Sequence, residues 1–284
     1  MEKLTRILAV VDKVDDGAVL LEKAVILARR FGAHVELLLH ESLHAQAFAT
    51  LCTALRYDEV TLSSVYRGAE PLHEIILRRV LATKPDLVMK APSGAHPLDR
   101  WTLDENDYCL ANECPVPLML VRHKAWAKPT RFAAAVDVAD DVSAETARAI
   151  LHTAGFIALG CHGLIDILYG ERERVDERVR MARAVKLAQL VREFHVGCER
   201  IQVFDGAPGE TLPPLAAARH YDVLVLGAHT HQPPRKTLFG TMTKRMVEAT
   251  DGDVVLVKAP LREIDMQPSR SFREERPQEC QQFL

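Results

Sequence analysis

The sequence predicts an α/β protein that contains two tandem, doubly wound, mostly parallel five-stranded sheets. Short, almost continuous apolar runs, typical of parallel strands buried on both faces, alternate with segments whose apolar residues follow a helical period. This alternation runs through the first 121 residues and then repeats. The length of 284 residues fits about two domains. Strand–helix–strand units favour parallel pairing through right-handed crossovers.

The first half is predicted to hold five strands and four helices. The clearest helix follows Gly17, because Leu20, Ala24 and Leu27 share one face and Gly32 stands at the C′ position. The predicted strands are residues 4–11, 34–39, 59–66, 86–90 and 116–121. The predicted helices are residues 17–31, 43–55, 70–83 and 104–113.

The second half repeats this order. Its helices are predicted at residues 144–154, where Gly155 ends the helix, and at residues 173–195. Its predicted strands are residues 132–136, 156–161, 200–204, 222–226 and 253–257. The long helix has mixed charges on its polar face, which is unlike a membrane helix. Its apolar stripe is expected to pack against the sheet or the other half and consists of Val175, Val179, Ala182, Val185, Ala188 and Val191.

The spacing of the strands supports a repeat and sets the domain boundaries. Aligning Asp86 with Asp222, an offset of 136 positions, also brings the last strands of the two halves into register without a gap. Asp12 and Asp137, which close the first strand of each half, align at an offset of 125. We therefore predict domains at residues 1–122 and 131–260, a linker at 123–130 and a mobile tail at 261–284.

Composition and charge exclude several classes of partner. With 36 Lys and Arg against 39 Asp and Glu, the net charge of −3 gives no overall cationic field for nucleic acid or anionic lipid. No apolar stretch approaches the roughly 20 residues of a membrane span, and acidic residues come too early for a signal peptide. The six cysteines are dispersed, as expected for buried thiols in a reducing compartment. A cytoplasmic protein is the expectation.

A loop after the fourth strand of the second half is the strongest candidate site. Ligands of doubly wound sheets bind beyond the carboxyl ends of the strands, yet the sequence has neither GxGxxG nor GxxxxGK[ST]. Instead Gly227-Ala-His-Thr230 is followed by nine residues and then by Gly240-Thr241-Met242-Thr243, which leads into a helix. Gly227 allows a close backbone approach, and the N–H groups of Gly240 and Thr241 would face an anion.

This spacing resembles the G-x2-G-x9-G-[S/T] loop of nucleotide-binding members of the universal stress protein family, with Thr230 in place of one glycine. With the five-strand order, the aspartates closing each first strand and the repeat, residues 3–260 resemble tandem members of the E type. The resemblance implies the adenine nucleotide alpha hydrolase-like fold and ATP, alone or with Mg, as ligand. The implied ATP-binding residues are Asp137, Gly227, His229, Thr230, Gly240, Thr241, Met242 and Thr243.

The resemblance also implies an internal pseudo-dimer in which the halves pair through their last strands, 116–121 and 253–258, with a homodimer left open. The equivalent loop of the first half reads Ala91-Pro-Ser-Gly94, nine residues, then Asp104-Glu105. Two carboxylates at a helix start satisfy the helix dipole themselves and repel a triphosphate. We therefore predict one competent site, in the second half, and a first half that holds a metal, a lipid or nothing.

Three functions remain open. The first is an ATP-binding stress-response or regulatory protein, without machinery for catalysis beyond slow ATP hydrolysis because no nucleophile–base pair or metal-ligand cluster accompanies the loop. The second is a nucleotide-independent interaction or small-ligand module of the same fold. The third, an adenylating enzyme, requires an SGGxDS-like loop after the first strand, where Asp12-Lys-Val-Asp and Asp137-Val-Ala-Asp stand.

Several residues have both a functional and a structural interpretation. His229 and His231, with Cys161 and His162 nearby, are either part of a zinc site or surface residues. Asp137 either accepts hydrogen bonds from adenosine or serves a turn or helix cap. The acidic residues at the start of the helix at 104–113 are either acid/base groups or caps, namely Asp104, Glu105 and Asp107.

Overall fold

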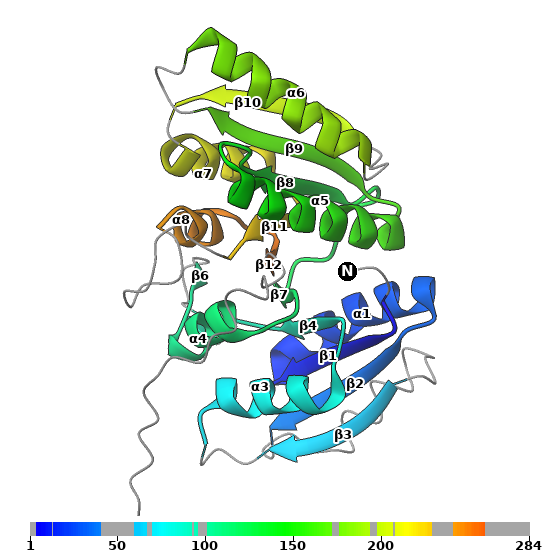
Figure 1. Ribbon diagram of the computed structural model, residues 1–284. Coiled ribbons are helices and arrows are strands. Elements are labelled where there is room, and N and C mark those ends of the chain that lie inside the picture. Colours follow the sequence, from blue (N-terminus) through cyan, green and yellow to red (C-terminus); the bar gives the residue numbers. More distant parts are fainter. Residues whose placement is uncertain are drawn as a thin grey trace, which may run out of the picture.

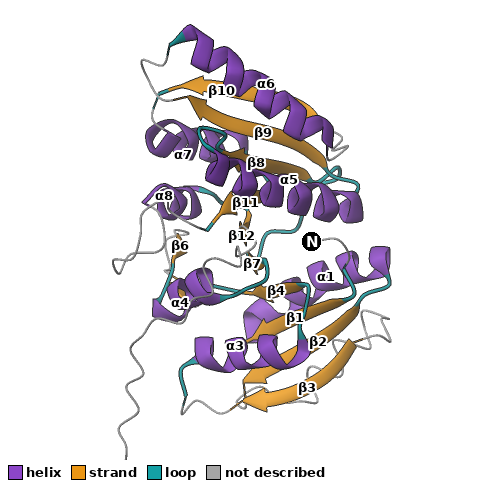
Figure 2. Ribbon diagram, in the orientation of Figure 1, coloured by secondary structure: helices purple, strands orange, loops and turns teal. Residues whose placement is uncertain are grey.

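The computed structural model describes residues 4–12, 14–40, 60–66, 70–92, 94–95, 101–171, 176–193, 198–206, 208–228 and 241–258. Within these ranges the chain forms a ten-stranded sheet and a two-stranded hairpin, with seven helices on the two faces of the sheet (Figure 1, Figure 2). The predicted helix at 43–55 and the predicted tail at 261–284 lie outside the described residues.

The elements of the first half follow the predicted alternation. Its strands are β1 (Arg6–Val11), β2 (His34–His40), β3 (Val60–Tyr66), β4 (Leu87–Lys90), β5 (Gly94–Ala95), β6 (Trp101–Thr102) and β7 (Leu118–Leu120). Its described helices are α1 (Val14–Phe31), α3 (Leu72–Thr83) and α4 (Glu105–Glu113). Apart from the β5–β6 hairpin, which lies in the loop before α4, each of these elements was predicted within a few residues.

The second half has the same order of elements. Its strands are β8 (Arg131–Val136), β9 (Leu164–Glu171), β10 (Cys198–Asp205), β11 (Val223–Gly227) and β12 (Asp253–Val257). Its helices are α5 (Asp141–Cys161), α6 (Glu177–Glu193), α7 (Pro208–Arg219) and α8 (Thr241–Ala249). The helix α7 was not predicted from the sequence, because Pro213 and Pro214 lie inside it and proline normally ends a helix.

The ten strands are arranged in the order β10-β9-β8-β11-β12-β7-β4-β1-β2-β3. Neighbours within each half are parallel, as predicted for doubly wound sheets. The halves meet where β7 pairs antiparallel with β12, with Met119 opposite Val255. This pairing, here called the seam, was expected from the sequence, and it joins the two expected five-stranded sheets into one (Figure 1).

Two apolar clusters fill the space between the sheet and its helices. Successive residues of a buried strand point to opposite faces, so Ile7 and Ala9 enter one cluster while Leu8 and Val10 enter the other. Helices α1, α5 and α6 cover the first cluster, and α3, α4, α7 and α8 cover the second. Each cluster contains residues from both halves, so the core is continuous across the seam.

The aligned aspartates of the two halves make equivalent contacts. Oδ2 of Asp86 accepts hydrogen bonds from the backbone N–H groups of Thr5 and Arg6, at 2.6 and 3.0 Å, where β1 begins. The carboxylate of Asp222 accepts from the N–H groups of Ala127 and Arg131, at 3.1 and 2.8 Å, where β8 begins. The alignment at an offset of 136 therefore places chemically equivalent residues at equivalent points of the sheet.

The strand predicted at residues 156–161 is wrong. Helix α5 continues through Gly155 to Cys161, His162 ends it in the left-handed region with φ of 53°, and β9 follows. The run is apolar because this end of α5 packs on α1 across the seam, where the rings of Phe31 and Phe156 stack at 4.4 Å. A side chain at Gly160 would meet Phe31 at 2.7 Å. A short apolar run does not separate a strand from a buried helical turn.

The predicted apolar stripe of α6 is wrong over most of its described length, although its last residue, Val191, packs against the first apolar cluster. Val179 and Val185 are 43% and 51% exposed, whereas Leu187 and Leu190 are buried. The buried face is thus a neighbouring side of the same helix. Each leucine removes more apolar surface from water than a single valine or alanine of the stripe.

A buried ion pair connects the two halves beside the seam. Nζ of Lys23, on α1, donates to both carboxylate oxygens of Asp253, on β12, at 2.9 and 2.7 Å. The same carboxylate accepts from the backbone N–H of Arg122 at 2.6 Å and from the indole N–H of Trp126 at 2.7 Å. The side chains of Lys23 and Asp253 are 3% and 1% exposed. The charges are therefore fully desolvated, and their mutual contacts compensate for the lost hydration.

Asp253→Asn is expected to lower the free energy of unfolding by about 3–5 kcal/mol, because the ammonium of Lys23 would stay buried without its counter-charge. Equilibrium urea denaturation measures the change. Asp251→Asn is the matched control, since Asp251 forms a half-exposed pair with Lys124 and its loss should cost about 1 kcal/mol or less. Equal losses for the two variants would contradict the structural role assigned to Asp253.

Candidate functional site

The strand order defines one point in each half where a ligand can bind. In doubly wound sheets this point lies beyond the carboxyl ends of the two strands at which the direction of winding reverses. These strands are β1 and β4 in the first half and β8 and β11 in the second. Asp12 and Ala91 follow β1 and β4, and Asp137 follows β8 while Gly227 ends β11. Asp137 and Gly227, both predicted site residues, therefore lie at the ends of adjacent strands.

Asp137 has a local role in the chain. Its Oδ1 accepts a hydrogen bond from the backbone N–H of Ala139 at 2.8 Å, which forms a turn directly after β8. The cap of α5 is a different residue, since Oδ1 of Asp140 accepts from the N–H of Ser143 at 2.7 Å. Of the two structural interpretations of Asp137, the turn is thus present, and the cap belongs to Asp140.

Gly227 and Thr243 contact each other at the end of β11. The Thr243 hydroxyl, which is buried in the first turn of α8, donates to the carbonyl oxygen of Gly227 at 3.1 Å. A side chain at Gly227 would meet Cγ2 of Thr146, on α5, at 2.9 Å, so packing alone already requires glycine. Helix α8 begins at Thr241 and Met242, and the predicted contacts His229, Thr230 and Gly240 lie outside the described residues.

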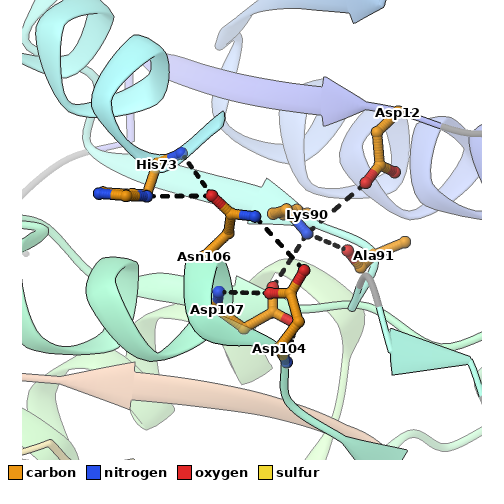
Figure 3. A network of polar contacts seen from close by, with 7 residues as sticks. All are labelled: Asp12, His73, Lys90, Ala91, Asp104, Asn106 and Asp107. Carbon is orange, nitrogen blue, oxygen red and sulfur yellow. Dashed lines mark hydrogen bonds and ion pairs between the residues drawn. The ribbon is translucent and has the colours of Figure 1, made fainter. Parts of the chain in front are cut away.

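The equivalent point of the first half contains a buried ion pair that sequence reasoning missed. Lys90 ends β4, and its fully buried Nζ donates to Oδ1 of Asp107 at 2.9 Å and to the carbonyl oxygen of Ala91 at 2.8 Å (Figure 3). Oδ2 of Asp12 lies 3.8 Å from the same nitrogen. The residues Asp12, Lys90, Ala91 and Asp107 are here called the Lys90 cluster. Its one sequence signal is a lysine at the end of an apolar strand.

The start of α4 is satisfied by its own side chains. Oδ1 of Asp104 accepts from the N–H of Asp107 at 2.8 Å, and Oδ2 of Asp107 accepts from the N–H of Asp104 at 3.3 Å, which is a capping box. Asn106 Oδ1 accepts from the N–H of His73, on α3, at 3.3 Å (Figure 3). The interpretation of Asp104 and Asp107 as caps is confirmed, and the N–H groups they bind are not directed at a ligand.

Corresponding positions of the two halves carry different chemistry. At the offset of 136, Lys90 aligns with Leu226 and Asp107 aligns with Thr243. The first half therefore has a charged pair in the place where the second half has a leucine and a hydroxyl. A carboxylate at Asp107 repels phosphate, whereas a hydroxyl at Thr243 does not. The two reversal points therefore differ in charge, although they lie at equivalent places in the fold.

The described residues give no support to a zinc site. Within them no group of three or more histidine, cysteine, aspartate or glutamate side chains is arranged to hold a metal ion. Helix α5 ends at Cys161 and His162, directly before β9. Because the first residue of β9, Leu164, pairs with Arg131, the first residue of β8, these two side chains lie near the start of β8. This is the edge opposite the loop after β11. His229 and His231 lie outside the described residues.

The strand order, the antiparallel seam and the two reversal points define an α/β protein with two joined, doubly wound halves. A model of the universal stress protein family matches residues 136–258, a range that contains every predicted nucleotide contact. The chain is 19% identical to Universal stress protein E of Salmonella typhi, over 91% of this chain and 95% of the relative. Residues 136–258 thus match the universal stress protein family, and most of the chain is similar to Universal stress protein E.

Solved structures share the same fold over nearly the whole chain. A universal stress protein from Pseudomonas aeruginosa UCBPP-PA14 covers 91% of this chain and 95% of its own length, with a TM-score of 0.77 and 20% identity. A universal stress protein from Archaeoglobus fulgidus covers 89% of this chain and 98% of its own length, with a TM-score of 0.64 and 11% identity. None of the described helices is long and apolar enough to cross a membrane.

Lys90→Leu is expected to lower the free energy of unfolding by about 3–5 kcal/mol, because Asp107 would remain buried without its cation. The double variant Lys90→Leu/Asp107→Thr, which introduces the residues of the second half, should recover most of that loss. Equilibrium denaturation of both variants measures the difference. Arg78→Met, which removes an exposed pair with Glu70, is the control and should cost about 1 kcal/mol or less. Additive losses in the double variant would contradict a buried, mutually compensating pair.

Proposed function

We propose that the chain is an ATP-binding stress-response or regulatory protein with one nucleotide site, in its second half. The observation that carries the proposal is the position of the loop motif: β11 ends at its first glycine and α8 begins directly after its last. The motif thus joins a strand to a helix N-terminus beside Asp137, at the reversal point of the sheet. Helix N-termini in this setting bind phosphate through their N–H groups.

The proposed nucleotide contacts follow the family resemblance. Asp137 would accept hydrogen bonds from the adenosine portion, and the start of α8 would bind the phosphates, with or without Mg. The remaining contacts would come from the loop and the first turn of α8, namely Gly227, His229, Thr230, Gly240, Thr241, Met242 and Thr243. We further propose that residues 1–122 and 131–260 are two copies of one domain.

The Lys90 cluster supports restriction of the site to the second half. Its internal ion pair and the capping box occupy the groups of the first half that would otherwise meet a nucleotide. Opening this half would separate Lys90 from Asp107 in a buried environment, which costs several kcal/mol. A second molecule of ATP is therefore not expected to bind the chain.

A nucleotide-independent interaction module is the alternative function. It is favoured by the finding that Gly227 and Thr243 already have structural roles, in packing against Thr146 and in the hydrogen bond between them. The cytoplasmic domain of a prokaryotic cation chloride cotransporter shares the fold, with a TM-score of 0.57 over 91% of this chain and 10% identity. Binding of ATP by the purified chain separates the two functions.

Isothermal titration calorimetry is expected to give one ATP per chain. Asp137→Asn should weaken binding about tenfold because a charged acceptor is lost, and Gly240→Asp should weaken it at least about tenfold because a carboxylate would face the phosphates. Asp251→Asn, which changes a half-exposed carboxylate before the start of β12, is the matched control and should leave the affinity unchanged. No binding at millimolar ATP would overturn the proposed function, and two equivalent sites would overturn its restriction to the second half.

A further inference from the structure

Helices α4 and α8 belong to different halves but cover the same face of the sheet. Leu110 and Ala111 of α4 and Met246 and Val247 of α8 enter the same apolar cluster. At the C-terminal end of α4, the carbonyl oxygen of Asn112 accepts a hydrogen bond from Nζ of Lys258. Lys258, which follows β12 of the second half, thus also contacts α4.

One side-chain contact connects the first turns of these helices. Nζ of Lys244 lies 5.9 Å from the ring centroid of Tyr108. A hydrogen bond to the Tyr108 hydroxyl raises the pKa of Lys244. Tyr108 directly follows Asp107 of the Lys90 cluster, and Lys244 directly follows Thr243, whose hydroxyl binds Gly227. A continuous series of contacts therefore leads from the buried ion pair of the first half to the end of β11 in the second.

The helix dipole at the start of α8 disfavours the charge of Lys244, whereas the contacts with Tyr108 and Glu248 favour it. A cation in the first turn of a helix opposes the helix dipole, and α8 has no acidic residue in its first turn. The contacts that hold it there are the ring of Tyr108 and, at 3.8 Å, the carboxylate of Glu248. An ammonium kept beside a helix N-terminus adds to the positive field that attracts phosphate.

We propose that Tyr108 is a positioning residue for the second-half site: held in place by the Lys90 cluster through α4, it fixes the first turn of α8 and the ammonium of Lys244 for phosphate binding. This inference rests on the proposed function for its ligand. The first half would thus hold α8 of the second half in position without binding a ligand itself. The internal ion pair of the first half keeps α4 in place without a bound nucleotide.

Tyr108→Ala tests the proposal with two measurements on the full chain. Amide hydrogen exchange of residues 241–249, measured without nucleotide, is expected to be faster at the start of α8. ATP affinity is expected to fall about three- to tenfold. Tyr108→Phe keeps the ring but loses the hydroxyl, so it should restore only part of both properties. In a Lys244→Met background, Tyr108→Ala should cause no further loss of affinity, because Tyr108 acts through Lys244.

Glu70→Gln, which removes an exposed ion pair with Arg78 outside α4 and α8, is the control and should leave exchange and affinity close to those of the unaltered chain. Unchanged exchange and unchanged affinity in a folded Tyr108→Ala variant would overturn the positioning role. Absence of ATP binding in the unaltered chain would overturn the proposed function instead. In that case the exchange measurement still decides whether Tyr108 positions α8.

Discussion

The carboxylate of Asp253 is the interaction on which the rest of the structure depends. It lies where the two halves meet and accepts hydrogen bonds from Lys23, Arg122 and Trp126, which come from α1 and from the segment between the halves. Without these donors a buried charge would stand beside the antiparallel pair of β7 and β12. With them, two sheets become one, and the apolar clusters on both faces continue from one half into the other.

The antiparallel seam places two similar halves in contact but does not make them equal. Near each reversal point, a residue at the end of the fourth strand and a residue in the first turn of the next helix decide the local chemistry. In the first half these are Lys90 and Asp107, which satisfy each other, and in the second they are Leu226 and Thr243. The same fold can therefore support a ligand site in one half and a self-contained structural core in the other.

Much of this organisation could be predicted from the sequence, since apolar runs and helical periodicity determine where most elements form. The failures have physical causes. Residues 156–161 are apolar because they pack against α1 across the seam, a contact that no local pattern reveals. The buried side of α6 is set by Leu187 and Leu190, and only the position of the sheet decides between the two apolar sides of that helix.

The candidate site, like the fold, could be predicted only in part from the sequence. The capping role of Asp104 and Asp107 could be predicted from a local motif. That the two halves differ at this loop could be inferred from Asp104 and Glu105, which stand where the second half has Gly240 and Thr241. The Lys90–Asp107 pair could not, because its partners lie on different elements and meet only once β4 and α4 are packed. The contact of Tyr108 with Lys244 depends in addition on the pairing of the two halves.

A crystal structure of the chain grown with excess ATP tests the central claim most directly, namely that one half is open to nucleotide and the other is closed by its own ion pair. The account predicts a single nucleotide, between the ends of β8 and β11 and at the start of α8, with Lys90 still bound to Asp107. A nucleotide between the ends of β1 and β4, with that ion pair broken, would contradict it.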